Sequence, residues 1–135
     1  MGSALLRGWI ASKSGHTILV VEPNPSGLVK EWAKSGAIGL YDPAETSKLP
    51  QLRAVVLALK PQAIKVERGL LQLLGPANAL VISIAAGITS NWLSSQLGTG
   101  ARIVRAMPNT PGSIGQGISV LCATREAAPD DRELA

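Results

Sequence analysis

Residues 54–87 read AVVLALKPQAIKVERGLLQLLGPANALVISIAAG, and this succession of apolar runs sets the architecture of the chain. The runs 54–59 and 80–84 are apolar on both faces, which is typical of buried, central strands in a parallel sheet. Between them, helical spacing extends over about 62–74 and ends at Gly75-Pro76. This alternation predicts βα units that build a parallel sheet.

The same alternation continues on either side of this region. Toward the N-terminus we expect a helix over 2–13, a strand over 17–22, a helix over about 26–35, a short strand near 38–41 and a loop through 42–50. Toward the C-terminus we expect a helix from Thr89 or Ser90 to Leu97, a strand from 102 into a loop at 108, a strand over 118–123 and a new helix from 129. The sequence therefore predicts an α/β fold with a doubly wound, mostly parallel sheet.

Composition bounds the kind of protein. With 135 residues, of which 46% are hydrophobic, the chain can form one packed core, and nothing indicates two complete domains. Its net charge of +4 is scattered rather than gathered in runs, so we expect no nucleic-acid or membrane partner. The single cysteine, Cys122, excludes an internal disulfide and alternates with Leu and Val on a strand, which predicts a buried core position. No signal peptide is recognisable, and we expect a cytoplasmic protein.

The strand that ends near Met107 runs directly into the loop Pro108-Asn109-Thr110-Pro111. Both prolines fix φ at about −65° and favour extended backbone in the residues before them, so Asn109 and Thr110 are expected on a stiff turn. Ligands of open α/β sheets bind at the carboxyl ends of strands. This loop is the clearest sign of a ligand site in the sequence.

Three other strand ends carry candidate residues. Glu22 stands where a dinucleotide-binding domain has the acid that accepts hydrogen bonds from the adenosine ribose, although a solvated acid beside a turn is the plainer alternative. Lys60 follows a buried strand and precedes Pro61, and this position presents the Lys60 amine at the rim of the sheet. An ordinary surface lysine is an equally good interpretation. The small residues 85–87 let a flat ring or a phosphate approach the backbone, or they simply reflect packing.

Five segments of the chain form a recognisable series: MGSAL at 1–5, VEPNP at 21–25, LALKPQ at 57–62, SIAAGIT at 83–89 and VRAMPNTP at 104–111. In order and spacing they resemble the N-terminal domain of pyrroline-5-carboxylate reductase, and the resemblance covers essentially the whole chain. It implies a Rossmann-type domain that binds NADPH or NADH. It also implies reduction of the cyclic imine 1-pyrroline-5-carboxylate to L-proline, the last step of proline biosynthesis.

The resemblance also implies a set of cofactor-binding residues: Gly2, Glu22, Asn24, Ala58, Leu59, Lys60, Pro61, Ala85, Ala86, Gly87, Met107, Asn109 and Thr110. Within this set, the residues from Met107 to Thr110 would shape the nicotinamide end, with Asn109 as the polar contact. Hydride transfer depends on orientation and electrostatics, so we expect no catalytic side chain and no metal ligand. His16 is interpreted as an ordinary turn residue.

The choice between NADH and NADPH stays open at this point. The carboxylate of Glu22 would repel a 2′-phosphate and accept hydrogen bonds from a free ribose diol, which favours NADH. In members of the family, the turn that follows can still accept NADPH, here through Asn24 and Ser26.

Complete members of the family differ from this sequence at both ends. They begin with a strand and a glycine-rich loop, of which Gly2 is the only trace here, and they continue into a helical domain that forms homo-oligomers. We therefore expect residues 1–124 to form a Rossmann-type domain that lacks its first strand, and residues 125–135 to begin the connection to an absent dimerisation domain. Such a truncated chain would be a poor enzyme.

Two other functions remain open. Another imine or β-hydroxyacid reductase with the same N-terminal domain would keep the cofactor cleft and differ in substrate. A non-catalytic nucleotide-binding fragment would bind cofactor without turnover of any imine.

Overall fold

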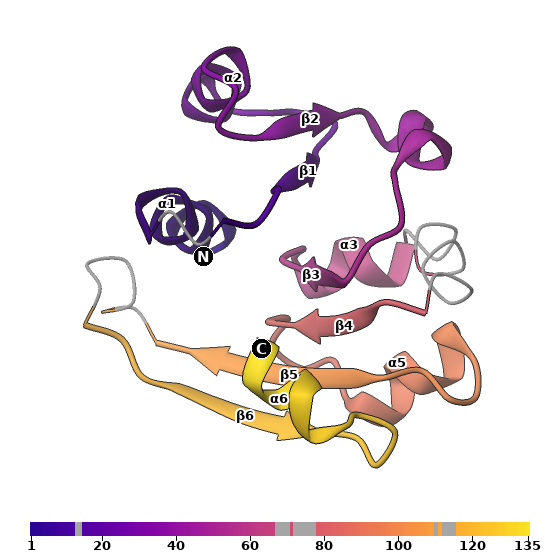
Figure 1. Cartoon of the computed structure of the whole chain (residues 1–135). Helices are drawn as coiled ribbons and strands as arrows, with labels where there is room; N and C mark the ends of the chain where they lie inside the picture. The colour runs from indigo at the N-terminus through magenta and orange to yellow at the C-terminus, as the bar shows by residue number, and fades with distance from the viewer. Residues whose placement is uncertain (13–14, 67–70, 72–77, 110, 112–115) are drawn as a thin grey trace. The chain divides into compact units, whose positions relative to one another are not determined.

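The computed structural model describes residues 1–12, 15–66, 71, 78–109, 111 and 116–135. Helices and strands alternate along most of these residues, as Figure 1 shows. Contacts divide the chain into two compact units, Met1–Pro50 and Gln51–Ala135. Each unit has a sheet and apolar clusters of its own.

The N-terminal unit contains a small parallel sheet with helices around it. Its elements are α1 (Gly2–Ser12), β1 (Leu19–Val21), α2 (Gly27–Lys34), β2 (Gly39–Tyr41) and the 3-10 helix η1 (Pro43–Lys48). β1 and β2 pair in parallel, and Leu6, Val29 and Ile38 are the buried centre of the unit. The hydroxyl of Ser26 accepts a hydrogen bond from the Val29 N–H, which caps α2 where the sequence predicts a helix start.

The helical turn η1 lies where a loop is expected from the sequence. Pro43 occupies its first turn, where a missing N–H costs no hydrogen bond. Asp42 accepts the Ala44 N–H at 2.9 Å, and the Glu45 carboxylate accepts the Asp42 N–H at 3.3 Å. This capping box stabilises a single short turn that has no apolar periodicity to announce it.

The C-terminal unit is built on a larger sheet. Its elements are β3 (Ala54–Leu57), α3 (Pro61–Val66), β4 (Leu80–Ser83), α5 (Ser90–Leu97), β5 (Ile103–Pro108), β6 (Ser119–Ala123) and α6 (Pro129–Leu134). The four strands lie side by side in the order β3-β4-β5-β6 (Figure 1). β3, β4 and β5 are parallel, and β6 is antiparallel to β5. The predicted α/β fold with a mostly parallel sheet is confirmed.

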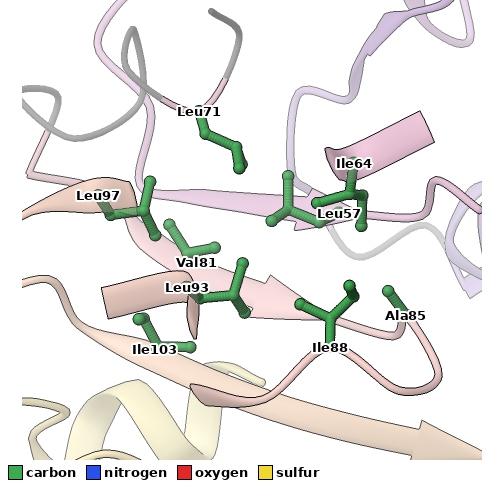
Figure 2. Packing of buried hydrophobic residues seen from close by; sticks show 9 residues of the cluster. All are labelled: Leu57, Ile64, Leu71, Val81, Ala85, Ile88, Leu93, Leu97 and Ile103. Atoms are coloured by element: carbon green, nitrogen blue, oxygen red, sulfur yellow. The ribbon is translucent and has the colours of Figure 1, made fainter. Parts of the chain in front are cut away.

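Both faces of this larger sheet are covered, because successive residues of a strand point to opposite faces. On one face, α3 and α5 pack against the strands in the cluster shown in Figure 2: Leu57, Ile64, Leu71, Val81, Ala85, Ile88, Leu93, Leu97 and Ile103. On the other face, the cluster comprises Leu80, Ile82, Val104, Ala106 and Ala127, with Leu134 of α6 against it. All four residues of β4 are buried, as the doubly apolar sequence predicts.

β3 is an edge strand of its sheet, which corrects the prediction of a central position. Among the described residues it pairs with β4 alone, and three of its four residues are only half-buried. Val55 packs against the cluster on one face, and Ala54 and Val56 pack against the cluster on the other. Apolar residues on both sides of a strand therefore indicate cover above and below, and they do not specify how many strands flank it.

Cys122 is exposed, so the prediction that it lies in the core is wrong. It belongs to β6, the outermost strand, in which four of five residues are exposed. The neighbouring Val120 and Leu121 are 66% and 44% exposed. Alternation of Val, Leu and Cys shows that the segment forms a strand, whereas its burial depends on which elements cover that part of the sheet.

An ion pair ties α6 to the sheet. The Arg102 guanidinium, just before β5, contacts the buried Asp131 carboxylate at 2.6 Å and donates a second hydrogen bond to the Asn78 carbonyl at 2.5 Å. The other oxygen of Asp131 accepts the Ala128 N–H at 2.9 Å. These bonds join the residues before β4 and β5 to the start of α6.

Candidate functional site

The carboxyl ends of three parallel strands bring most of the predicted site residues to one edge of the larger sheet. β3 is followed by residues 58–61, β4 by residues 84–87, and β5 ends at Pro108 beside Asn109. The registers run in the same direction for all three strands, and the Ile84 N–H donates to the Leu57 carbonyl at 3.3 Å. The segments 58–61, 85–87 and 107–109 therefore share the edge at which α/β sheets bind ligands.

Exposure separates the residues of this edge into two groups. Six of them are exposed, namely Ala58, Lys60, Ala86, Gly87, Met107 and Asn109. By contrast, Leu59 packs against the core and Ala85 is only 3% exposed, with its side chain in the cluster shown in Figure 2. Leu59 and Ala85 can therefore offer a ligand their backbone but little of their side chains.

The turn at residues 85–87 leaves space beside the backbone. Ala86 is exposed, and Gly87 has φ of +70°, a left-handed conformation that side-chain-bearing residues rarely adopt. A Cβ at Gly87 would meet no atom within 4 Å, so the backbone angle rather than crowding favours glycine at this position. A flat ring or a phosphate can approach this turn from solvent.

Two polar side chains that the sequence interpretation missed hold the same turn. The Oγ of the buried Ser83 accepts the Ala85 N–H at 3.4 Å, and the Arg105 Nη2 donates to the Ala85 carbonyl at 3.0 Å. Ser83 and Arg105 are direct partners in the β4–β5 register. The available signal was a polar residue at an otherwise apolar position of each strand.

Asn109 closes the hairpin between β5 and β6. Its side-chain oxygen accepts the Ile118 N–H at 3.0 Å, and its own N–H donates to the Ile118 carbonyl at 3.3 Å. Asn109, the first of the two residues predicted on a stiff turn, thus makes a specific cross-strand contact. Because Ile118 takes one of the two lone pairs of the oxygen, Asn109 can direct its amide N–H donors and the second lone pair to a ligand. Thr110 lies outside the described residues.

Lys60 stands at the start of α3. Its carbonyl accepts the Ile64 N–H at 3.1 Å, and Pro61 begins the helix, where its fixed φ is favourable. The side chain of Lys60 is exposed. Lys60 therefore lies at the carboxyl edge of the sheet, and the presentation of its amine to a ligand stays a prediction.

The remaining predicted residues belong to the N-terminal unit. Glu22 directly follows β1, and its Oε1 accepts the Asn24 N–H at 3.0 Å, which ties the acid to its own turn. Asn24 is exposed, and Ser26 already uses its hydroxyl as the cap of α2. Gly2 is the first residue of α1.

Two hollows in the C-terminal unit lie away from these residues. One, of about 470 Å³, is lined by Gln51, Leu52, Arg53, Asn78, Arg102, Asp130, Asp131 and Leu134, at the amino ends of the strands. The second, of about 170 Å³, is also at that end and involves Thr99 and Gly100. Neither includes a predicted site residue.

Two further structural findings bear on function. No group of three His, Cys, Asp or Glu side chains gathers in the described residues at a position suited to a metal ion. Among the helices that the structure describes, none has the length and apolar character required to cross a membrane.

Comparison with known proteins finds relatives of this chain. Pyrroline-5-carboxylate reductase of Escherichia coli is 31% identical over 135 residues, which cover 97% of this chain and 49% of the enzyme. A solved pyrroline-5-carboxylate reductase from Coxiella burnetii superposes with a TM-score of 0.81 at 32% identity, over 98% of this chain and 49% of that one. The chain is homologous to pyrroline-5-carboxylate reductases. It spans about half the length of the relatives that it matches.

A pyrroline carboxylate reductase of Plasmodium falciparum, solved with NADP bound, shares the fold with a TM-score of 0.74 at 24% identity. The alignment covers 99% of this chain and 48% of the Plasmodium reductase. No family model matches the sequence. The resemblance to pyrroline-5-carboxylate reductase that the five sequence segments indicate is confirmed by the relatives and by the fold.

Proposed function

We propose that the chain forms the NAD(P)-binding part of a pyrroline-5-carboxylate reductase, which reduces 1-pyrroline-5-carboxylate to L-proline. Homology along nearly the whole chain to reductases of this name carries the proposal. The exposed residues of segments 58–61, 85–87 and 107–109 at one sheet edge support it, because a nicotinamide cofactor needs an open platform of this kind.

The chemistry asks little of the protein beyond binding and orientation. A bound nicotinamide supplies a hydride to the imine carbon of the substrate, and the imine nitrogen carries a proton, so the C=N bond becomes the C–N bond of proline. We assign the small residues Ala58, Ala86 and Gly87 to close approach of the cofactor. Met107 and Asn109 are assigned to its nicotinamide end, and the Lys60 amine to its negative charges.

The proposal also covers the cofactor and the cellular location. The reductase of Plasmodium, which has the same fold, holds NADP, and the Glu22 turn suits a ribose diol, so we propose that NADPH and NADH both bind. A chain with a single cysteine forms no internal disulfide, and disulfides are rare in the reducing cytoplasm. The single cysteine therefore supports a cytoplasmic location. The substrate is a small molecule.

Titration of the purified chain with NADPH and NADH tests the function directly. Trp9, Trp32 and Trp92 provide the fluorescence, and energy transfer to the bound nicotinamide is expected to rise to saturation. If the same preparation turns over an imine, its preference for 1-pyrroline-5-carboxylate separates this reductase from one that acts on another imine. Folded protein that binds neither cofactor would contradict the proposal.

Glu22→Ser is expected to change which cofactor the chain prefers. Removing the carboxylate takes away a negative charge that would face a 2′-phosphate, so NADPH should gain about tenfold in affinity relative to NADH. The ratio of the two dissociation constants is the measurement. Glu31→Ser, at an exposed acid of α2, is the matched control and should leave the ratio unchanged. An unchanged ratio in Glu22→Ser would remove Glu22 from the cofactor site.

A further inference from the structure

The backbone of Ala85 is held from both sides by one pair of cross-strand neighbours. Ser83 Oγ accepts its N–H at 3.4 Å, and Arg105 Nη2 donates to its carbonyl at 3.0 Å. Ser83 of β4 is directly opposite Arg105 of β5 in the parallel register. The side chain of Ser83, on the strand that precedes the turn, and that of Arg105, on the neighbouring strand, therefore fix the first peptide units of the turn.

Arg105 carries a cost that a packing role would not require. Its Nε is buried and has no hydrogen-bond partner in the part of the chain that the structure describes. A buried donor without a partner destabilises the folded state, and an apolar side chain would pack at this position without that cost. The polar contacts of the guanidinium are therefore the feature that distinguishes arginine from valine or leucine here.

The same guanidinium also reaches the end of its own strand. Nη2 lies 3.4 Å from the Met107 Sδ, so one group touches both the turn after β4 and the exit of β5. Figure 2 places the Ala85 side chain beside Ile88 in the core, which anchors the apolar side of the turn. With Ala85 held by the core and by Ser83 and Arg105, the exposed Ala86 and Gly87 are kept facing solvent.

We propose that Ser83 and Arg105 act as positioning residues, which hold the 85–87 turn in the conformation that receives the cofactor. The role in cofactor binding rests on the proposed function. Neither residue touches the cofactor in this proposal. They act through the backbone of Ala85, and the Arg105 guanidinium also contacts the sulfur of Met107.

Amide hydrogen exchange of residues 84–88 in the ligand-free protein tests the positioning role without any cofactor. Arg105→Met removes the donors and keeps an unbranched side chain, and exchange of this segment should become about tenfold faster because a charge-assisted hydrogen bond is lost. Arg105→Lys retains a positively charged donor group and should keep exchange within about threefold of the wild type. Arg125→Gln, at an exposed arginine after β6, is the control and should change nothing.

The dissociation constant of NADPH supplies the second readout. Arg105→Met is expected to weaken NADPH binding about tenfold, Arg105→Lys to restore most of the affinity, and Ser83→Ala to weaken binding about threefold. In the double variant Ser83→Ala/Arg105→Met the loss should not exceed that of Arg105→Met alone, since the turn is already released.

The outcomes separate this inference from the proposed function. Unchanged exchange at 84–88 in Arg105→Met overturns the positioning role, whether or not NADPH binds. Faster exchange with unchanged NADPH affinity overturns its connection to the cofactor, as do losses that simply multiply in the double variant. Failure of the wild type to bind NADPH would refute the proposed function, and the exchange data would then decide by themselves whether the pair holds the turn.

Discussion

Leu93→Ala is expected to lower the free energy of unfolding by about 3 kcal/mol. Leu93 is fully buried, in α5, and belongs to the cluster that joins α3 and α5 to the larger sheet (Figure 2). Truncation to alanine removes apolar contacts and leaves a cavity that surrounding side chains fill only in part. Urea unfolding followed by circular dichroism measures the change.

Leu121→Ala is the matched control for this prediction. Leu121 lies on β6 in the same unit but is 44% exposed, so the same truncation should cost less than about 1 kcal/mol. Equal losses in the two variants would contradict the division between the buried centre of the sheet and its exposed outer strand.

Ala86→Phe is expected to weaken NADPH binding at least about 30-fold with little change in stability. Ala86 is exposed, so a larger side chain there meets solvent rather than the core. In the complex, however, the ring would occupy the space that the cofactor needs beside the 85–87 turn, and overlap of this kind costs about 2 kcal/mol or more. Calorimetric titration with NADPH gives the affinity, and a melting curve checks the fold.

The control for Ala86→Phe is Ala44→Phe, which places the same ring at an exposed alanine of η1. It should leave NADPH affinity unchanged. If Ala86→Phe binds NADPH as tightly as the wild type does, the cofactor does not lie against this turn and the assignment of Ala86 and Gly87 fails.

Much of the fold follows from local signals in the sequence. The Thr89 hydroxyl accepts the Trp92 N–H at 3.2 Å, so the predicted helix start at Thr89 or Ser90 is confirmed with Thr89 as the cap. The doubly apolar run at 80–84 predicts the buried strand β4 correctly, within one residue at its end. Both features depend on residues that are neighbours in the chain, which is why a single sequence suffices to find them.

The remaining features depend on distant residues. The order of strands in the sheet decides whether β3 has one neighbour or two, and it also decides whether anything covers Cys122. No local pattern in the sequence records this order. The contacts of Arg105 with Ala85 and of Arg102 with Asp131 join residues 20 and 29 positions apart. The sequence shows a charge on an apolar strand, but its partner is visible only when the strands are aligned.

The antiparallel pairing of β5 with β6 has a consequence for the order of folding. These strands are joined by a short connection and can form a hairpin within roughly 1–10 μs. Each parallel pair forms more slowly, because its strands are joined by a longer crossover connection. The β5–β6 hairpin is therefore expected to form early. β4 is then expected to pair with β5, and β3 with β4. The edge to which we assign the cofactor needs all three parallel strands aligned, so it is expected to be the last part of the C-terminal unit to form.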